Sequence, residues 1–265
     1  MPLRVVVAGV GGRMGREIVA AAARDPTLRI VGGTVRPGSP TLNSPWSTVT
    51  NVAIAAASLE TDPRAFANRA DVAIDFTAPA VTVSNAEACA ELDMPLVVGT
   101  TGLNADQVEL LEVSAKSIPL FYAPNMSTGI AALTHLLPLL ARTLAGFELE
   151  IVETHHRHKA DAPSGTALLL ADAIGFEMGS DHPRHYTFGR HGNAPRQSGE
   201  IGIHAVRSGG NPGEHVVILT DEGEEIRVAH RAFGRAAYVR GALTAAKFVA
   251  GRAPGMYRMR DLLDA

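Results

Sequence analysis

A glycine cluster at residues 9–15, Gly-Val-Gly-Gly-Arg-Met-Gly, follows a β-branched run at residues 5–8 and precedes a helical pattern at residues 13–24. Glycines between a strand and a helix allow a tight turn, close packing of both elements and close approach of a phosphate to backbone N–H groups. The spacing is G-x-x-G-x-x-G with Gly11 added, not the strict G-x-G-x-x-G of dinucleotide-binding loops. We interpret the cluster as a pyrophosphate-binding loop, with a plain strand-to-helix turn as the alternative.

Strand-like and helix-like segments alternate through the first 122 residues of the chain. All-apolar strands joined by helices are typical of a parallel sheet that is covered on both faces. We therefore predict an α/β fold with an N-terminal Rossmann-type, doubly wound parallel sheet. Its predicted strands cover residues 5–8, 28–35, 72–76, 96–98 and 120–122, its predicted helices cover residues 13–24, 82–91 and 105–116, and residues 37–51 are predicted to form a long loop.

The second half of the chain changes character after an apolar helical segment at residues 129–144. Short strand-like runs with glycine-rich turns predict a C-terminal α+β domain with an open mixed sheet. The predicted strands cover residues 148–155, 201–205, 215–220 and 224–230, and further helices are predicted at residues 164–174 and 235–250. We predict a dinucleotide-binding domain at residues 1–126 and a substrate-binding domain at residues 127–234, with residues 235–265 packing back on the first.

Composition excludes several classes of protein. Lys and Arg number 24 against 27 Asp and Glu, a net charge of −3 that gives no basic excess for nucleic acid or an anionic membrane. Cys89 is the single cysteine, so neither a disulfide framework nor a cysteine-based zinc site can form within the chain. The longest stretch without charged residues, 117–141, is interrupted by prolines and polar residues and does not resemble a membrane span. We expect a soluble, cytoplasmic protein.

The end of the second predicted strand bears on cofactor choice. NAD-binding sites of this type place an acid there, which binds the ribose 2′-hydroxyl. Here the strand ends at Arg36, and no acid is present. A guanidinium suits a 2′-phosphate through charge-assisted, bidentate hydrogen bonds. We therefore predict that NADPH is preferred over NADH, with a solvated loop arginine as the alternative.

Two further loops follow predicted strands. Ligands of open α/β sheets lie beyond the carboxyl ends of the strands, so both loops are placed to line a nicotinamide pocket. The first loop is Gly99, Thr100, Thr101 and Gly102, and the second is Ala123, Pro124, Asn125, Met126 and Ser127.

Residues 153–166 hold three of the ten histidines within four positions. One interpretation is a metal site, although adjacent histidines on a strand point to opposite faces and no H-x-x-x-H pair is present. A second is a solvated polar loop. A third is an acid–base and anion site, because histidine titrates near neutrality and Lys159 supplies a cation. Ser164, Gly165 and Thr166 open a predicted helix, whose free N–H groups add a second anion-binding feature.

These segments together resemble the 4-hydroxy-tetrahydrodipicolinate reductase (dihydrodipicolinate reductase) family, which acts in the diaminopimelate branch of lysine biosynthesis. The resemblance runs from end to end. It includes Gly-Arg-Met-Gly in the glycine cluster, Ile-Asp-Phe-Thr at residues 74–77, Gly-Thr-Thr-Gly at residues 99–102 and residues 123–129. Its most specific part is His-His-Arg-His-Lys followed by Asp-Ala-Pro-Ser-Gly-Thr-Ala within residues 153–168.

The resemblance implies that a cyclic imine loses its hydroxyl as water and that NAD(P)H reduces the resulting double bond. It implies His155 as the general acid, Lys159 as a second proton donor or charge stabiliser, and His156 as a substrate contact. Gly165 and Thr166 would hold a carboxylate of a small dicarboxylate substrate, and the second domain would form the core of a homotetramer. Its cofactor residues would be Gly9, Val10, Gly11, Gly12, Arg13, Met14, Gly99, Thr100, Thr101, Ala123, Pro124, Asn125 and Met126.

One departure from the family pattern and two alternative functions remain. Family members that use NADH well carry an acid where this chain has Arg36, which supports the preference for NADPH. The alternatives are another two-domain dehydrogenase with a catalytic cysteine or lysine, and a dinucleotide-sensing or metal-binding protein without turnover. Cys89 lies inside a predicted helix and is poorly placed as a nucleophile. Histidines 182, 185, 191 and 204 receive no role, and Arg190 and Arg207 are candidates to reach a carboxylate.

Overall fold

The computed structural model of the chain describes residues 1–177 and 185–265. The chain forms two compact units: unit 1 comprises Met1–Thr128 and Arg235–Ala265, and unit 2 comprises Gly129–Gly234. Unit 1 is therefore built from two stretches that are far apart in the sequence. Among the described residues, no helix is long and apolar enough to cross a membrane.

Unit 1, which is described throughout, contains a parallel seven-stranded sheet with the order β12-β6-β5-β4-β1-β2-β3. The order reverses between β1 and β4, which is the point where ligands of doubly wound sheets bind. Its strands are β1 (Leu3–Ala8), β2 (Leu28–Thr34), β3 (Ser58–Glu60), β4 (Val72–Asp75), β5 (Leu96–Val98), β6 (Pro119–Tyr122) and β12 (Gly255–Tyr257).

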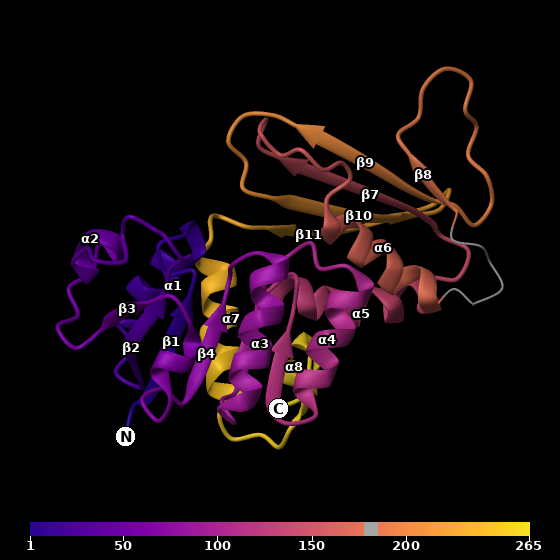
Figure 1. The fold of residues 1–265 in the computed structure, drawn as a ribbon. Coiled ribbons are helices and arrows are strands. Elements are labelled where there is room, and N and C mark those ends of the chain that lie inside the picture. Colours follow the sequence, from indigo (N-terminus) through magenta and orange to yellow (C-terminus); the bar gives the residue numbers. More distant parts are fainter. Residues whose placement is uncertain (178–184) are drawn as a thin grey trace. The chain divides into compact units, whose positions relative to one another are not determined.

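Helices cover both faces of this sheet, because its strands are apolar on both sides. Figure 1 shows α3 and α4 in front of the strands and α7 behind them, and α1 packs against α7. Buried side chains of β5, α3 and α4, such as Leu96, Cys89 and Leu111, belong to one core cluster. The helices of unit 1 are α1 (Arg13–Ala22), α2 (Trp46–Thr50), the 3₁₀ helix η1 (Pro63–Phe66), α3 (Pro79–Glu91), α4 (Ala105–Ala115), α7 (Ala236–Val249) and α8 (Met259–Leu263).

Over its described residues, unit 2 forms a five-stranded sheet with the order β11-β10-β7-β9-β8. β7 pairs with β10 antiparallel and with β9 parallel, so the sheet is mixed. Its elements are α5 (Thr128–Thr143), β7 (Glu148–His155), α6 (Gly165–Glu177), β8 (Tyr186–Phe188), β9 (Ile201–Arg207), β10 (Glu214–Thr220) and β11 (Glu225–Arg231). With the parallel sheet of unit 1, this arrangement confirms the predicted fold class.

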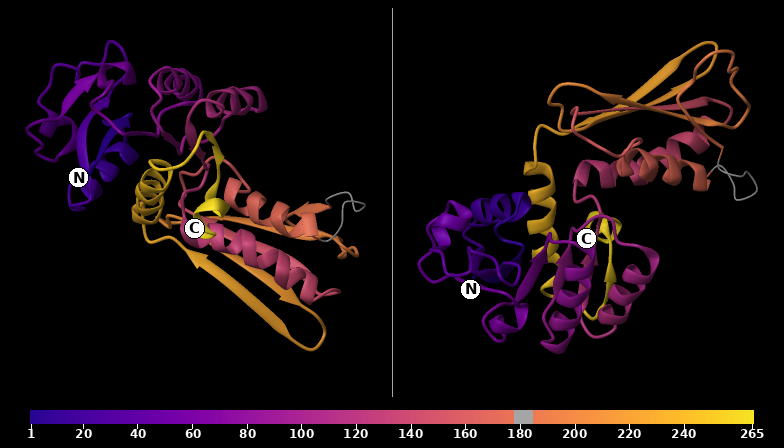
Figure 2. Two further views of the ribbon diagram at one scale, coloured as in Figure 1. Left: turned by 90° about the horizontal axis from the view of Figure 1, so that it is seen from below. Right: turned by 45° about the horizontal axis from the view of Figure 1, so that its top comes forward.

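Both helices of unit 2 lie on the same face of its sheet (Figure 2). Leu137 of α5, Leu170 of α6 and Ile151 of β7 are fully buried in one core cluster. Successive residues of a strand point to opposite faces, and alternate residues of β7 are buried. Glu153 and His155 lie on the same helix-covered face as Ile151. The buried side chains along this face of β7 therefore begin in the hydrophobic core and end with two titratable groups.

Candidate active site

The glycine cluster forms the turn from β1 to α1, as the sequence predicts. Gly9 has a positive φ of 75°, and its carbonyl oxygen accepts a hydrogen bond from the Gly12 N–H at 2.9 Å. A Cβ at position 15 would lie only 2.4 Å from that carbonyl oxygen, so α1 can pack on the turn only because Gly15 has no side chain. Gly12 is the N-cap of α1 and has no side chain to satisfy the first-turn N–H groups.

The residues of this turn do not all face solvent. The N–H groups of Gly9 and Val10 donate to the Thr34 carbonyl oxygen at 3.0 and 3.1 Å, and the Val10 side chain is fully buried. These two residues therefore hold the turn against β2. Gly12 and Arg13 are exposed, and Gly11 and Met14 are half-buried, so this half of the cluster offers the accessible surface.

The structure ends β2 at Thr34, and Arg36 is exposed two residues later. The neighbouring strand β3 pairs with β2 and sets Glu60 opposite Thr34. An acidic residue thus lies beside the end of β2, although β3 contributes it. The sequence pattern did not indicate Glu60, because β3 is only three residues long and lies in no predicted strand.

A buried carboxylate connects the loops that follow β4 and β5. Asp75 Oδ1 accepts hydrogen bonds from the Thr77 N–H at 2.8 Å, the Thr77 hydroxyl at 2.7 Å and the Thr100 hydroxyl at 3.1 Å, while Oδ2 accepts from Asn85 Nδ2 at 2.8 Å. The Thr100 side chain is consequently internal, whereas Thr101 and Gly102 are exposed. Sequence analysis assigned no role to Asp75. An acid that ends an apolar strand is the signal that could have identified it.

The third predicted cofactor loop follows β6 and is held within unit 1. The Ala123 N–H donates to the Val98 carbonyl oxygen at 3.1 Å, and Asn125 Oδ1 accepts from the Ser127 N–H at 2.9 Å. Ala123 and Met126 are buried, Asn125 is half-buried and Pro124 is exposed. Since β6, β5, β4 and β1 are parallel neighbours, all three predicted cofactor loops emerge at the same edge of the sheet.

His155 ends β7 in unit 2 and contacts a buried acid. Its Nδ1 lies 2.6 Å from Glu153 Oε2, and the Glu153 side chain has no exposed surface. Arg207 at the end of β9 binds both oxygens of the same carboxylate, at 2.8 and 2.7 Å. An ionised carboxylate only accepts hydrogen bonds, so the imidazole donates from Nδ1 and its Nε2 is the nitrogen left for other chemistry.

Burial and charge act in opposite directions on these groups. Burial lowers the pKa of His155, and Glu153 opposes this effect without cancelling it. Burial also disfavours ionisation of Glu153, but hydrogen bonds from Arg207, His155 and Ser164 outweigh it and hold the pKa of that carboxyl below its ordinary value. The His215 ring lies 5.2 Å from the His155 ring, and burial lowers the pKa of His215 to about 4.

The predicted anion-binding segment begins at Ser164 and continues into α6. Both polar groups of Ser164 have internal partners. Its N–H donates to Glu153 Oε1 at 2.9 Å, and its Oγ accepts from the Ala167 N–H at 3.1 Å and lies 3.0 Å from His215 Nε2. Ser164 is therefore part of the buried framework. Gly165 is exposed and Thr166 is half-buried, so these two residues present the start of the helix.

Lys159 and His156 lie on the loop between β7 and α6. Lys159 is half-buried, and its Nζ lies 2.9 Å from Asp161 Oδ1. Arg207 donates to the Asp161 carbonyl oxygen at 2.6 Å, which ties this loop to the Glu153 carboxylate. His156 is half-buried, and its buried Nδ1 has no hydrogen-bond partner among the residues that the structure describes.

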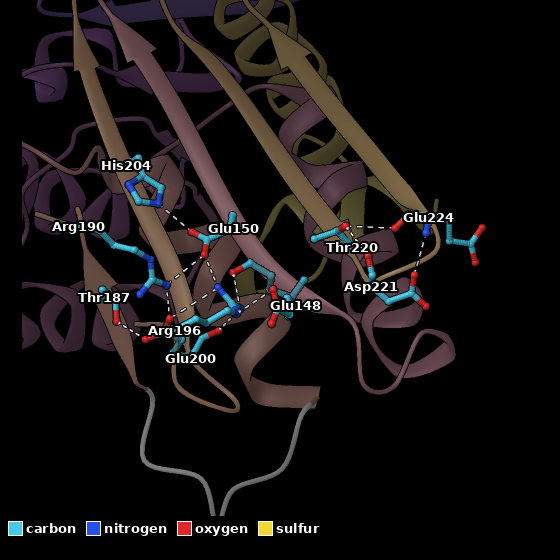
Figure 3. Close-up of polar contacts among 11 residues, drawn as sticks. Glu148, Glu150, Thr187, Arg190, Arg196, Glu200, His204, Thr220, Asp221 and Glu224 are labelled. Carbon is cyan, nitrogen blue, oxygen red and sulfur yellow. Dashed lines mark hydrogen bonds and ion pairs between the residues drawn. The ribbon is translucent and has the colours of Figure 1, made fainter. Parts of the chain in front are cut away.

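Arg190 and the histidines without an assigned role lie outside the contacts described above. Glu150 Oε2 lies 2.8 Å from His204 Nε2, and Glu150 also binds Arg190 (Figure 3). His185 and His191 are exposed, and His182 lies outside the described residues. Within the described ranges, no group of three His, Cys, Asp or Glu side chains is arranged to hold a metal ion.

Comparisons with known proteins agree on one family. Models of the N-terminus and the C-terminus of dihydrodipicolinate reductase match residues 3–126 and 129–263. A 4-hydroxy-tetrahydrodipicolinate reductase from Rubrobacter xylanophilus is 43% identical over 99% of both chains, and one from Chromohalobacter salexigens is 41% identical over 98% of both.

A solved structure, the dipicolinate-bound dihydrodipicolinate reductase from Paenisporosarcina sp. TG-14, shares the fold with a TM-score of 0.77 at 23% identity, covering 97% of this chain and 98% of that one. The two-sheet fold described above is therefore also the fold of a dihydrodipicolinate reductase. This chain is an oxidoreductase that uses NAD(P)H, and it belongs to the dihydrodipicolinate reductase family.

Proposed function

We propose that this protein reduces 4-hydroxy-tetrahydrodipicolinate to tetrahydrodipicolinate with NAD(P)H, as a step of diaminopimelate and lysine biosynthesis. The observation that carries the proposal is the imidazole of His155, which is buried against Glu153 on the strand that leads into Lys159 and the start of α6. The names of the curated relatives support this substrate, and the dipicolinate-bound structural relative supports a small dicarboxylate.

The substrate is held by its two carboxylates. The N-terminus of α6 presents the N–H groups of Gly165 and Thr166, which carry partial positive charge and bind anions. Lys159 supplies a full positive charge and a second source of protons, and His156 contacts the substrate. Ser164 positions the start of the helix, because its N–H binds Glu153 and its hydroxyl contacts His215.

The reaction needs a hydride and a proton. After the ring loses its hydroxyl as water, a proton and a hydride, which NAD(P)H would supply when bound, would add across the resulting double bond. His155 donates that proton from Nε2, since Nδ1 is bound to Glu153, and it then regains a proton from solvent.

The cofactor binds at the sheet edge of unit 1. The turn at Gly12 and Arg13 fits a pyrophosphate, because Gly12 has no side chain and leaves the first-turn N–H groups of α1 accessible. Thr101 and Asn125 are the polar, accessible residues of the two loops proposed for the nicotinamide end. When bound, the cofactor supplies the hydride.

Arg36 selects NADPH in this proposal, because its exposed side chain can pair with a 2′-phosphate. We expect Arg36→Ala to weaken NADPH binding roughly 10-fold, the value of one charge-assisted contact of about 1.5 kcal/mol, and to leave NADH binding unchanged. Titration of cofactor fluorescence measures both constants. Equal loss for the two cofactors would remove Arg36 from this role.

The catalytic assignment is tested with the coupled product of aspartate semialdehyde and pyruvate. His155→Gln is expected to lower kcat by roughly 10²–10⁴, the usual contribution of a general acid, with NADPH affinity near that of the parent. Full turnover by this variant would overturn the role of His155. No oxidation of NADPH by the parent protein in this assay would overturn the proposed substrate.

We further propose that unit 2 is the substrate-binding and oligomerisation domain of a homotetramer and that the protein is cytoplasmic. The family resemblance supports the tetramer, and the single cysteine, Cys89, fits a reducing compartment. The molar mass in solution tests the assembly.

A further inference from the structure

One fully buried carboxylate in unit 2 contacts the proposed proton donor, the residue that begins the proposed anion-binding segment, and an arginine. Glu153 Oε2 lies 2.6 Å from His155 Nδ1 and 2.8 Å from an Arg207 nitrogen, and Oε1 lies 2.9 Å from the Ser164 nitrogen and 2.7 Å from the second Arg207 nitrogen. Both oxygens thus receive two donors each. Four donors hold the Glu153 carboxylate in a single orientation, and the carboxylate in turn fixes the position of each donor.

The imidazole of His155 is held from the opposite side by backbone. Gly213, with φ of +148°, lies against Nε2, and a Cβ added there would be 2.9 Å from that nitrogen. A side chain at this position would crowd the ring, so glycine leaves room for the imidazole beside the start of β10. Of the two ring nitrogens, Nδ1 faces the carboxylate and Nε2 is the one without a side-chain hydrogen bond in the described structure.

We infer that Glu153 is a positioning residue that fixes the proton of neutral His155 on Nδ1, reserves Nε2 for proton transfer, and couples that nitrogen to the start of α6 through the Ser164 N–H. The inference rests on the proposed function, because it gives His155 the role of proton donor. Glu153 itself does not touch substrate. It acts through the ring and through the helix start, in the manner of the acid that orients a catalytic histidine.

Several charges around the imidazole determine how strongly it holds a second proton. The negative charge of Glu153 favours the imidazolium, whereas burial and the positive charges of Lys159 and Arg207 oppose it. His215 packs edge-on against the ring and, with a pKa of about 4, is neutral at neutral pH. Glu153 is therefore the one group facing His155, among the residues described, that stabilises its acidic form.

Replacement of Glu153 by glutamine keeps the shape and removes the charge. We expect Glu153→Gln to lower kcat roughly 10- to 100-fold, less than loss of the imidazole, with a smaller change in NADPH affinity. Because loss of a negative charge lowers the pKa of His155, the alkaline limb of the kcat profile should move to lower pH by about one unit or more. Glu153→Asp, which keeps the charge, should restore the position of that limb in part.

Glu150→Gln is the matched control. Glu150 lies on the opposite face of the same strand and also binds arginine and histidine, so its replacement should leave the alkaline limb in place. An unmoved limb in Glu153→Gln, with only a uniform loss of activity and stability, would reduce Glu153 to a structural residue. A Glu153→Gln change made on top of His155→Gln should lower kcat no further.

A measurement on the parent protein covers the case in which the variants do not fold. Nitrogen NMR of the labelled imidazole distinguishes the two neutral tautomers, and we expect His155 to carry its proton on Nδ1. A neutral ring protonated on Nε2 would overturn the inference. The proposed function fails separately, if the parent protein does not oxidise NADPH with the coupled product of aspartate semialdehyde and pyruvate.

Discussion

Two of the three glutamates of strand β7, Glu150 and Glu153, each bind an arginine and a histidine on their own face of the sheet. Glu153, on the helix-covered face, has no exposed side-chain surface, whereas the Glu150 side chain on the other face is 22% exposed. The same three residue types thus occur around a fully buried carboxylate and around a partly exposed one. The difference indicates that burial, and not the choice of residues, separates a group that controls a proton from a group that fastens a loop.

The Glu150 cluster fastens the segment between β8 and β9. Arg190 and Arg196 both reach from this segment to Glu150 and to Glu200, and Arg196 also donates to the Leu149 carbonyl oxygen at 3.2 Å (Figure 3). Glu200 accepts a further bond from the Thr187 hydroxyl at 2.8 Å. Several overlapping contacts therefore hold the segment, so no one of them is indispensable.

The Glu153 cluster has no such redundancy. Arg207 is the single guanidinium on its carboxylate among the described residues, and it also donates to the Asp161 carbonyl oxygen in the loop that carries Lys159. Loss of Arg207 would leave the interior carboxylate without a cationic partner, which is far more costly than loss of a surface ion pair.

The largest expected effect separates the two arginines. Arg207→Met should lower the free energy of unfolding by about 3–5 kcal/mol, because it strands the buried Glu153 carboxylate. Arg190→Met should cost about 1 kcal/mol or less, since Glu150 keeps Arg196, His204 and access to water, and the buried Glu200 keeps Arg196 and Thr187. Urea unfolding at neutral pH measures both changes. Equal losses would show that burial does not distinguish the clusters.

A smaller effect concerns acid. The folded-state pKa of Glu153 lies below its unfolded value of about 4.3, so its contribution to stability is complete above pH 4.3 and is lost as the pH falls through the folded pKa. Glu153→Gln should therefore flatten the decline in stability below about pH 4. Because the carboxylate is buried, this difference should persist in 1 M salt, where the screening length is about 3 Å. A difference that salt abolishes would place the carboxylate in contact with solvent.

Much of the fold followed from apolar patterning. The strands at Leu96–Val98 and Glu148–His155 have the predicted bounds, and α1 begins at the predicted residue 13. Short elements were missed. Residues 37–51, rich in proline and polar residues, were predicted to be a loop, yet Trp46–Thr50 forms α2 with Trp46 and Val49 buried. β3, β8 and β12 have three residues each, too few to show a period, and unlike Leu96–Val98 they are not wholly apolar runs.

The candidate site was predicted less completely than the fold. The sequence pattern indicated His155, Lys159 and the start of α6, because those residues are close together in the chain. Glu153 was not singled out, although strand periodicity alone places it on the same face as His155. Arg207 comes from a strand more than fifty residues away, and only the pairing of β7 with β9 brings the two ends together. Arg207 was a candidate to reach a carboxylate, and in the structure it binds the carboxylate of Glu153.

The discontinuous construction of unit 1 has a consequence for synthesis of the chain. Strand β12 pairs with β6, and α7 packs against β4, β5 and β6, yet both are translated after the whole of unit 2. A nascent chain that has just left the ribosome up to residue 234 would expose the edge of β6 and the apolar surface awaiting α7. We expect this intermediate to depend on chaperones, since a bare strand edge invites pairing with other chains.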